Sequence, residues 1–112
     1  MKEEDMSQDV LNQIKLDVQS NKILIYMKGT PQNPQCGFSA ATVQLFQGLG
    51  VPFATRDVIA NLEFRQRVPE FSNWPTFPQI FINGKLIGGC DIIHEMHERG
   101  ELEPLIKEAL GK

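Results

Sequence analysis

The tetrapeptide Cys36-Gly37-Phe38-Ser39 places a single thiol where a redox protein would carry its active site. It follows an apolar run (residues 23–27) and a loop rich in Gly and Pro, and it opens a segment with a helical apolar pattern. At a helix start, unpaired backbone N–H groups and the positive end of the helix dipole favour the thiolate, the reactive form of cysteine. In a Cys-x-x-Cys motif the fourth residue would be a second thiol, but here it is serine, which cannot form a disulfide. Thiol chemistry at Cys36 therefore needs a second thiol from another molecule, or a metal.

The composition is that of an ordinary globular protein with one modest core. The chain has 112 residues, of which 41% are hydrophobic and 22% are charged, and these values argue against extensive disorder. The formal net charge of −3 gives no sign of the basic face that a nucleic-acid binder needs, so we expect no nucleic-acid partner. Apolar runs stay far below the ~20 residues of a membrane span, so we expect no membrane partner.

The acidic N-terminus and the small number of cysteines bear on the compartment. Residues 1–5 lack the apolar stretch of a signal peptide and the arginines of a transit peptide. Cys36 and Cys90 are too few for a secreted disulfide framework. We therefore expect a cytoplasmic protein or, alternatively, the mature form of an organelle matrix protein after removal of its leader. Within the chain, we expect residues 1–6 to form a solvated tail and residues 7–112 to form a single domain.

Apolar periodicity and turn residues predict alternating helices and strands. Ser7 could cap a first helix, Asn61 could cap a third, and Asn83-Gly84 is a strong signal for a two-residue hairpin turn. Pro31 and Pro34 exclude a helix in the loop after the first strand. The predicted helices start near Ser7, span residues 37–47, run from Asn61 to about Val68, and follow Gly89 with a break near Gly100; the predicted strands are 23–27, 53–58, 79–82 and 85–87.

The order of these elements predicts the topology. A helix joins the first two strands, which requires a right-handed parallel crossover, and the last two strands form an antiparallel hairpin. The compact solution is an α/β fold with a four-stranded mixed sheet and helices on both faces, an arrangement that resembles the thioredoxin-like fold. Cys36 then lies after the first strand, at the start of the crossover helix. In the last helical region we expect Ile92, Ile93 and Met96 to face inward.

Four motifs together resemble those of one known family, the monothiol (CGFS-type) glutaredoxins. The resemblance covers roughly residues 8 to 110, and the motifs occur in the family's order. Cys-Gly-Phe-Ser alone would only be suggestive, whereas the combination is highly specific. The motifs are Tyr26-Met27-Lys28-Gly29, Pro34-Gln35-Cys36-Gly37-Phe38-Ser39, Trp74-Pro75-Thr76-Phe77-Pro78-Gln79 and Gly88-Gly89-Cys90-Asp91.

The resemblance implies a glutathione site, and the chemistry of its residues suits that tripeptide. Lys28 and Arg65 would hold the glycine carboxylate. The backbone of Phe77, where the resemblance implies a cis bond to the next proline, would pair with the cysteinyl part as an added strand. The backbone amides of Cys90 and Asp91 would bind the γ-glutamyl carboxylate, and the Asp91 side chain would bind its ammonium group.

Plain structural roles remain open for the same residues. Lys28 could be an ordinary lysine at the end of a strand, and Arg65 could lie on a solvated helix face. Cys90 could be a small buried residue, and Asp91 could cap a helix. Trp74 and Phe77 could be core aromatics. His94 and His97 lie three residues apart and could share a helix face, but surface histidine pairs are commoner than metal sites.

The resemblance also implies a [2Fe-2S] cluster, and a count of ligands explains how one thiol per chain can suffice. Such a cluster takes four ligands, usually thiolates. Two chains provide two Cys36 thiolates and two bound glutathiones provide the others, so Cys36 would be the metal ligand in a homodimer. The cluster would pass to apo iron–sulfur acceptor proteins, and BolA-family proteins are implied as partners. The resemblance therefore implies that the protein is an iron–sulfur carrier that acts in cluster assembly and iron homeostasis.

The alternative is a glutathione-dependent thiol–disulfide oxidoreductase, in which Cys36 attacks protein–glutathione mixed disulfides. One catalytic thiol suffices for this reaction if free glutathione resolves the intermediate. The loop over residues 29–35 resembles the longer loop of the monothiol class, which favours the carrier with weak oxidoreductase activity at most. A non-redox interaction module is disfavoured because the thiol and the whole pocket are retained.

Overall fold

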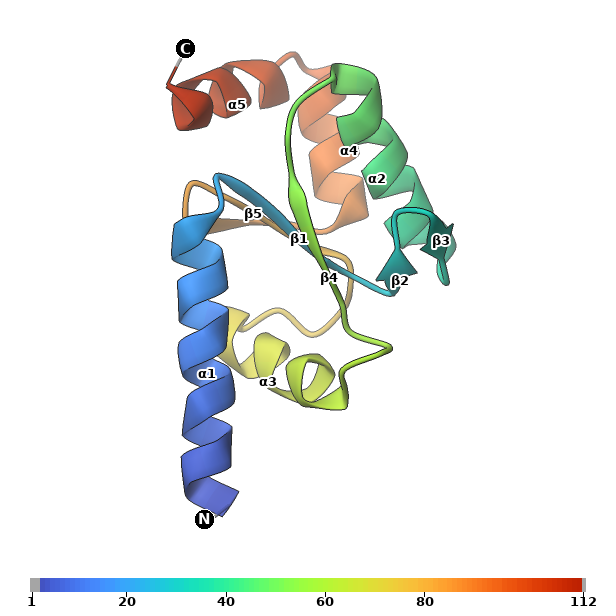
Figure 1. Ribbon diagram of the computed structural model, residues 1–112. Helices are drawn as coiled ribbons and strands as arrows, with labels where there is room; N and C mark the ends of the chain where they lie inside the picture. Colours follow the sequence, from blue (N-terminus) through green and yellow to red (C-terminus); the bar gives the residue numbers. More distant parts are fainter. Residues whose placement is uncertain (1–2, 112) are drawn as a thin grey trace.

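The computed structural model describes the backbone of residues 3–111 and the side chains of residues 9–111. A mixed sheet lies between two groups of helices, with α1 and α3 on one face and α2, α4 and α5 on the other (Figure 1). Among the described residues, no helix is long and apolar enough to cross a bilayer. The helices are α1 (Glu3–Ser20), α2 (Gly37–Leu49), α3 (Leu62–Ser72), α4 (Cys90–Glu98) and α5 (Leu102–Leu110); the strands are β1 (Ile23–Met27), β2 (Gly29–Thr30), β3 (Asn33–Pro34), β4 (Ala54–Asp57), β5 (Gln79–Ile82) and β6 (Lys85–Gly88).

Strand β1 lies inside the main sheet, whose strand order is β4-β1-β5-β6. It pairs in parallel with β4 and antiparallel with β5, so that Tyr26 is opposite Arg56 on one side and Gln79 on the other. Strands β5 and β6 form the antiparallel hairpin, and its turn residue Asn83 has a positive φ of 53°, which asparagine tolerates. The four-stranded mixed sheet and the Asn-Gly hairpin predicted from the sequence are therefore confirmed.

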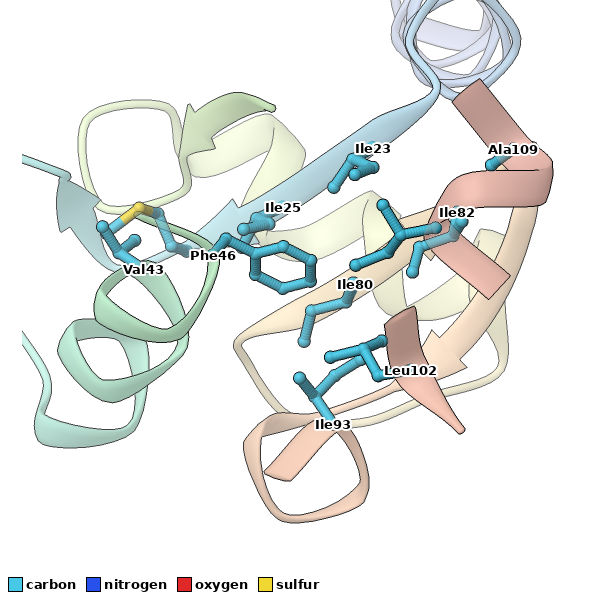
Figure 2. Close-up of a cluster of buried hydrophobic side chains, with 11 residues drawn as sticks. Ile23, Ile25, Val43, Phe46, Ile80, Ile82, Ile93, Leu102 and Ala109 are labelled. Carbon is cyan, nitrogen blue, oxygen red and sulfur yellow. The ribbon is translucent and has the colours of Figure 1, made fainter. Parts of the chain in front are cut away.

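One face of the sheet packs against α2, α4 and α5 (Figure 2). Alternate residues of β1 and β5 contribute to this core because successive side chains of a strand point to opposite faces. Phe46 of α2 is completely buried, and its ring lies toward Ile25 and Ile80. This packing holds against the sheet the two helices, α2 and α4, that begin at Cys36 and Cys90. The cluster consists of Ile23, Ile25, Met27, Val43, Phe46, Ile80, Ile82, Ile93, Leu102, Ile106 and Ala109.

The opposite face packs against α1 and α3 and contains a charge pair. Arg56 makes two hydrogen bonds to Asp17, at 2.8 and 2.9 Å, and the Tyr26 hydroxyl lies 3.5 Å from the same carboxylate. Burial raises the pKa of Tyr26, and the neighbouring Asp17 raises it further, so the hydroxyl stays protonated and donates. Each of the two charges has a partner, so neither is left uncompensated. Because Asp17 belongs to α1 and Arg56 and Tyr26 belong to the sheet, these bonds join α1 to the sheet. The apolar part of this core consists of Ile14, Val18, Leu24, Tyr26, Val58, Phe64, Val68 and Phe81.

Three features differ from the sequence-based expectations. Helix α1 begins at Glu3, so the helix starts before Ser7 and includes part of the expected tail, whose side chains lie outside the described residues. Helix α3 continues through Pro69, because Phe71 in its last turn packs against the core on that face. Residues 29–34, expected as a loop, form a short antiparallel hairpin of β2 and β3.

Candidate functional site

A cleft of about 600 Å³ lies beside the start of α2. Its walls come from the end of β1, from α3, from the segment 74–78 and from the start of α4. The structure thus brings together residues that are far apart in the sequence. All six residues predicted for the site line this cleft: Lys28, Cys36, Arg65, Phe77, Cys90 and Asp91. The other lining residues are Phe38, Pro69, Trp74, Pro75, Thr76, Pro78, Gly89 and Ile92.

Cys36 is the N-cap residue of α2 and has an extended backbone, with φ −152° and ψ 136°. Its side chain is half-buried, and the pKa of the thiol is lowered, first by the N–H of Ser39 and then by that of Phe38. The charge of Lys28 and the hydroxyl of Ser39 add to this lowering, while partial burial opposes it. The helix start therefore favours the thiolate, as expected from the sequence.

Ser39, which replaces the second thiol of a Cys-x-x-Cys motif, is completely buried. Its hydroxyl oxygen accepts a hydrogen bond from the backbone N–H of Lys28 at 3.1 Å. This bond joins the start of α2 to the end of β1, and so it fixes the backbone of the cation relative to the helix that carries the thiol. Sequence reasoning treated Ser39 only as a missing thiol and did not find this structural role.

The loop that leads to the thiol is held at its first residue, Gly29. This residue has a φ of +91°, and a Cβ there would lie 2.5 Å from the carbonyl oxygen of Asn33, so only glycine fits. Its N–H donates to Oδ1 of Asp57 at 2.9 Å, and the same oxygen accepts two further backbone N–H groups from the turn after β4. Asp57 therefore joins the loop beside Lys28 to the turn that precedes α3.

Two cations line the cleft from different elements. Lys28 is half-buried just after β1, and Arg65 is exposed on α3. Among the described side chains neither forms a salt bridge, whereas the neighbouring Arg67 pairs with Glu70 at 3.1 Å. The two charges can therefore bind a carboxylate that comes from outside the chain.

The segment from Trp74 to Pro78 forms one wall of the cleft. The bond between Phe77 and Pro78 is cis, which confirms the expectation from the resemblance. Phe77 packs partly against the core beside α1 and α3 and also lines the cleft, so this aromatic has both a structural and a site position. The side chain of Gln79 hydrogen-bonds to this segment, and sequence reasoning did not single it out.

The start of α4 forms another wall. Its N-cap residue is Gly89, so the expectation that Asp91 caps the helix is wrong, because Asp91 already lies in the first helical turn. A Cβ on Gly89 would lie 3.3 Å from the carbonyl oxygen of Pro78, and glycine thus allows the two walls to approach closely. Ile92 was expected to face inward, but it is 37% exposed, because its side chain lines the cleft instead of packing between helix and sheet.

A second hollow of about 510 Å³ adjoins the cleft. Phe38, which is 60% exposed, lines both spaces. The shared residues are Cys36, Phe38, Cys90 and Asp91, and the second hollow adds Gly37, Ala41 and His94. The Cys36 side chain therefore borders two neighbouring spaces.

The two histidines make separate contacts. Nδ1 of His94 lies 2.8 Å from the carbonyl oxygen of Cys90, and because a carbonyl only accepts, Nδ1 carries the proton. Nδ1 of His97 lies 3.6 Å from a carboxylate oxygen of Glu103. Within the described part of the chain, no three His, Cys, Asp or Glu side chains are grouped so that they could hold a metal ion.

Comparison with known proteins identifies the family of this chain. The profile of the Glutaredoxin family matches residues 23–87. The chain is 56% identical over 88 residues to the probable monothiol glutaredoxin GrlA of Legionella pneumophila, covering 79% of this chain and 99% of the relative. It is 52% identical over 102 residues to glutaredoxin 4 of Buchnera aphidicola, covering 91% of this chain and 95% of the relative.

Solved structures have the same fold. A buckwheat glutaredoxin–glutathione complex superimposes with a TM-score of 0.84 at 28% identity, covering 97% of this chain and 96% of that chain. The mixed sheet with helices on both faces is therefore the thioredoxin-like glutaredoxin fold, as the order of the elements predicted. The matched residues include the strand before the thiol, the CGFS motif and the cis-proline wall. This chain belongs to the glutaredoxin family, in its monothiol branch.

Proposed function

We propose that the chain binds glutathione in the cleft and, as a homodimer, carries a labile [2Fe-2S] cluster that it transfers to apo iron–sulfur proteins. One observation carries this proposal: the Cys36 thiol, whose pKa is lowered, lies where the cleft meets the second hollow. A reactive thiolate is thereby next to a space for glutathione and next to a space open to a partner. The family of the chain uses glutathione, which supports the first part.

The cleft offers a partner for each charged end of glutathione. Lys28 and Arg65 bind the glycine carboxylate, and the Phe77 backbone pairs with the cysteinyl part. The N-terminal amides of α4, at Cys90 and Asp91, take the γ-glutamyl carboxylate, and the Asp91 side chain takes the ammonium group. The tripeptide then runs along the cleft past Cys36. The buckwheat relative was solved as a complex with glutathione, which supports this use of the fold.

The cluster is cargo, and its ligands come from two chains. A [2Fe-2S] cluster takes four ligands, which two Cys36 thiolates and two glutathione thiolates supply. Two of the four ligands are then held without a covalent link to the protein, so the cluster can leave easily for an acceptor. We extend the proposal to cluster assembly and iron homeostasis in the cytoplasm, with BolA-family proteins as heteromeric partners.

The lowered pKa of Cys36 also favours a second candidate, glutathione-dependent disulfide reduction. The thiolate attacks the glutathione sulfur of a protein–glutathione mixed disulfide and releases the protein thiolate. Free glutathione then attacks the Cys36–glutathione disulfide, which regenerates Cys36 and forms glutathione disulfide. Turnover of mixed disulfides compared with cluster content distinguishes the two candidates.

Anaerobic reconstitution with iron, sulfide and glutathione tests the carrier proposal by visible absorption and native mass. We expect a coloured dimer with about two irons, two sulfides and two glutathiones, following the four-thiolate count. Removal of the cluster with a chelator should give a colourless, smaller species and release glutathione. A small thiol without the two carboxylates should give a weaker cluster, since the cleft charges would have nothing to bind. A stable cluster formed without any added thiol would overturn the shared-glutathione mechanism.

A further inference from the structure

The side chain of Gln79 connects the cleft wall to the main sheet. Gln79 is the first residue of β5 and is paired with Tyr26 of β1. It is completely buried, and its Nε2 donates to the carbonyl oxygens of Trp74 at 2.7 Å and Thr76 at 3.2 Å. Both acceptors belong to the segment that lines the cleft. One buried amide therefore holds two points of this wall.

The carbonyl groups fix the orientation of this amide. Carbonyl oxygens only accept hydrogen bonds, so the NH2 group of Gln79 must face them and its Oε1 must point away. This Oε1 is buried and has no hydrogen-bond partner among the described residues. A buried acceptor without a partner costs stability that an apolar side chain of similar size would not lose. The stability of the core therefore does not explain why this position is a glutamine. The two hydrogen bonds that its NH2 group donates to the wall do explain it.

Few other hydrogen bonds hold the backbone of this segment. Among the described residues, the backbone–backbone hydrogen bonds outside helices and strands include none from residues 74–78. Pro75 and Pro78 have no N–H to donate. The N–H of Trp74 donates to the hydroxyl of Ser72 at 3.2 Å, which joins the segment to the end of α3. Among the described residues, the amide of Gln79 is the side chain that hydrogen-bonds this wall to the sheet.

We propose that Gln79 is a positioning residue for glutathione, an inference that rests on the proposed glutathione site. By binding the carbonyls of Trp74 and Thr76, it orders the backbone of Phe77, which would pair with the cysteinyl part of the tripeptide. A wall that is already ordered loses less conformational freedom when the ligand binds, so affinity rises. Strand β5, which begins at Gln79, pairs with β1, which ends just before Lys28, so the same end of these two inner strands positions both the wall and the cation.

Fluorescence and calorimetry together test this role. Trp74 is the one tryptophan of the chain, so its emission reports directly on the wall. Gln79→Met keeps the length of the side chain without its donors, and Gln79→Glu keeps the shape but replaces the NH2 group with an oxygen. In both variants, folded by circular dichroism, we expect about tenfold weaker glutathione binding and stronger quenching of Trp74 by acrylamide. If one variant does not fold, the other carries the test.

Two matched controls separate positioning from general stability. Gln47→Met makes the same chemical change at an exposed site on α2, and Ile106→Val weakens the core in α5. We expect both to keep the wild-type affinity and quenching. Wild-type values in the folded Gln79 variants would overturn the inference, and so would an equal loss in Ile106→Val. A wild type that binds no glutathione would instead overturn the proposed function, while the quenching comparison would still test the hold of Gln79 on the wall.

Discussion

Two helices of this fold begin at a cysteine, and the two helix starts differ in what surrounds the thiol. Cys36 is the N-cap of α2, whereas Cys90 is the first residue of α4, and both are half-buried and free. The pKa of Cys36 is lowered, above all by the N–H of Ser39, with the charge of Lys28 as a weaker cause. The sulfur of Cys90 instead lies 3.4 Å from Nδ1 of His94, whose proton is directed at a carbonyl oxygen.

The two cysteines occupy different positions relative to their helix caps. The side chain of an N-cap residue can turn back over the free N–H groups of the first turn, and these groups then stabilise a negative charge. Cys90 lies one position later, already inside the helix, and its sulfur has the His94 imidazole as a neighbour. We therefore expect Cys36, the cap residue with the lowered pKa, to act as the nucleophile or ligand.

Replacing each cysteine in turn gives the largest expected difference between the two helix starts. Cys36→Ser should abolish cluster binding, because a hydroxyl cannot replace an activated thiolate as a ligand. Cys90→Ser should largely preserve it, since the proposed contact of Cys90 uses its backbone. Visible absorption after anaerobic reconstitution with glutathione measures both. Equal loss of absorption in the two folded variants would contradict the assignment of Cys36 as the ligand.

The two helix starts also differ in charge, with Lys28 beside Cys36 and Asp91 beside Cys90. Lys28→Ala should weaken glutathione binding by about 1.5–3 kcal/mol, or roughly 10- to 150-fold, because it removes a charge-assisted bond to a carboxylate. Calorimetry measures the affinity. Lys22→Ala is the matched control, since this lysine is exposed just before β1 and does not line the cleft. Unchanged affinity in Lys28→Ala would make Lys28 an ordinary strand-end lysine.

Local patterns in the sequence predicted the parts of the fold that local residues determine. The five buried residues of β1 appear as an uninterrupted apolar run, and Asn83-Gly84 specifies its own turn. The hairpin of β2 and β3 was missed because contacts distant in sequence hold it: Gly29 is bonded to Asp57, 28 residues away. The predicted end of α3, near Val68, was too early: the helix continues through Pro69 to Ser72, because packing of its last turn outweighs the loss of one hydrogen bond.

The site was predictable where a residue type carries its own chemistry. Cys36 could be named from its own position and chemistry, whereas Lys28 and Asp91 were named through the family resemblance, with charges that suit the charged ends of glutathione. Gln79 carries no such signal, since an amide side chain in a sequence gives no sign of complete burial or of the carbonyls it meets. Ile92 was misplaced because helical periodicity marks a face as apolar but does not tell whether a sheet or a cleft lies against it.

A second thiol in the first turn of α2 would test whether position limits the redox chemistry of this chain. Ser39→Cys should raise the reduction of glutathione mixed disulfides severalfold, because a thiol in the same turn as Cys36 can resolve the intermediate within the chain. The natural second thiol, Cys90, lies on another helix. Ser39→Ala is the control, since it also removes the hydroxyl that accepts the Lys28 N–H but adds no thiol. Equal turnover in Ser39→Cys and wild type would contradict the resolving role of this position.

The smallest expected effect compares a backbone N–H with the charge of Lys28, two of the groups that lower the pKa of Cys36. In a Cys90→Ser background only one thiol remains, and its alkylation rate against pH reports the thiolate. Because the folded pKa is lowered, the reactive form persists to lower pH, and the midpoint should lie below that of the same chain unfolded in urea. Phe38→Pro removes one N–H from the first helical turn, where proline is tolerated, and should raise the midpoint. Lys28→Ala should raise it no more than this, since the charge is the weaker cause.

A side-chain control and a change of salt concentration separate the effect of the N–H on the pKa of Cys36 from that of the Lys28 charge. Phe38→Ala removes the same exposed ring as Phe38→Pro but keeps the N–H, so its midpoint should stay at the value of the Cys90→Ser parent. Added salt screens a charge near the surface but leaves a hydrogen bond in place. Salt should therefore raise the midpoint slightly in the parent and not at all in Lys28→Ala. If Lys28→Ala alone removed the whole lowering, the charge and not the cap position would activate Cys36. The difference between the two helix starts would then come from the lysine beside one of them.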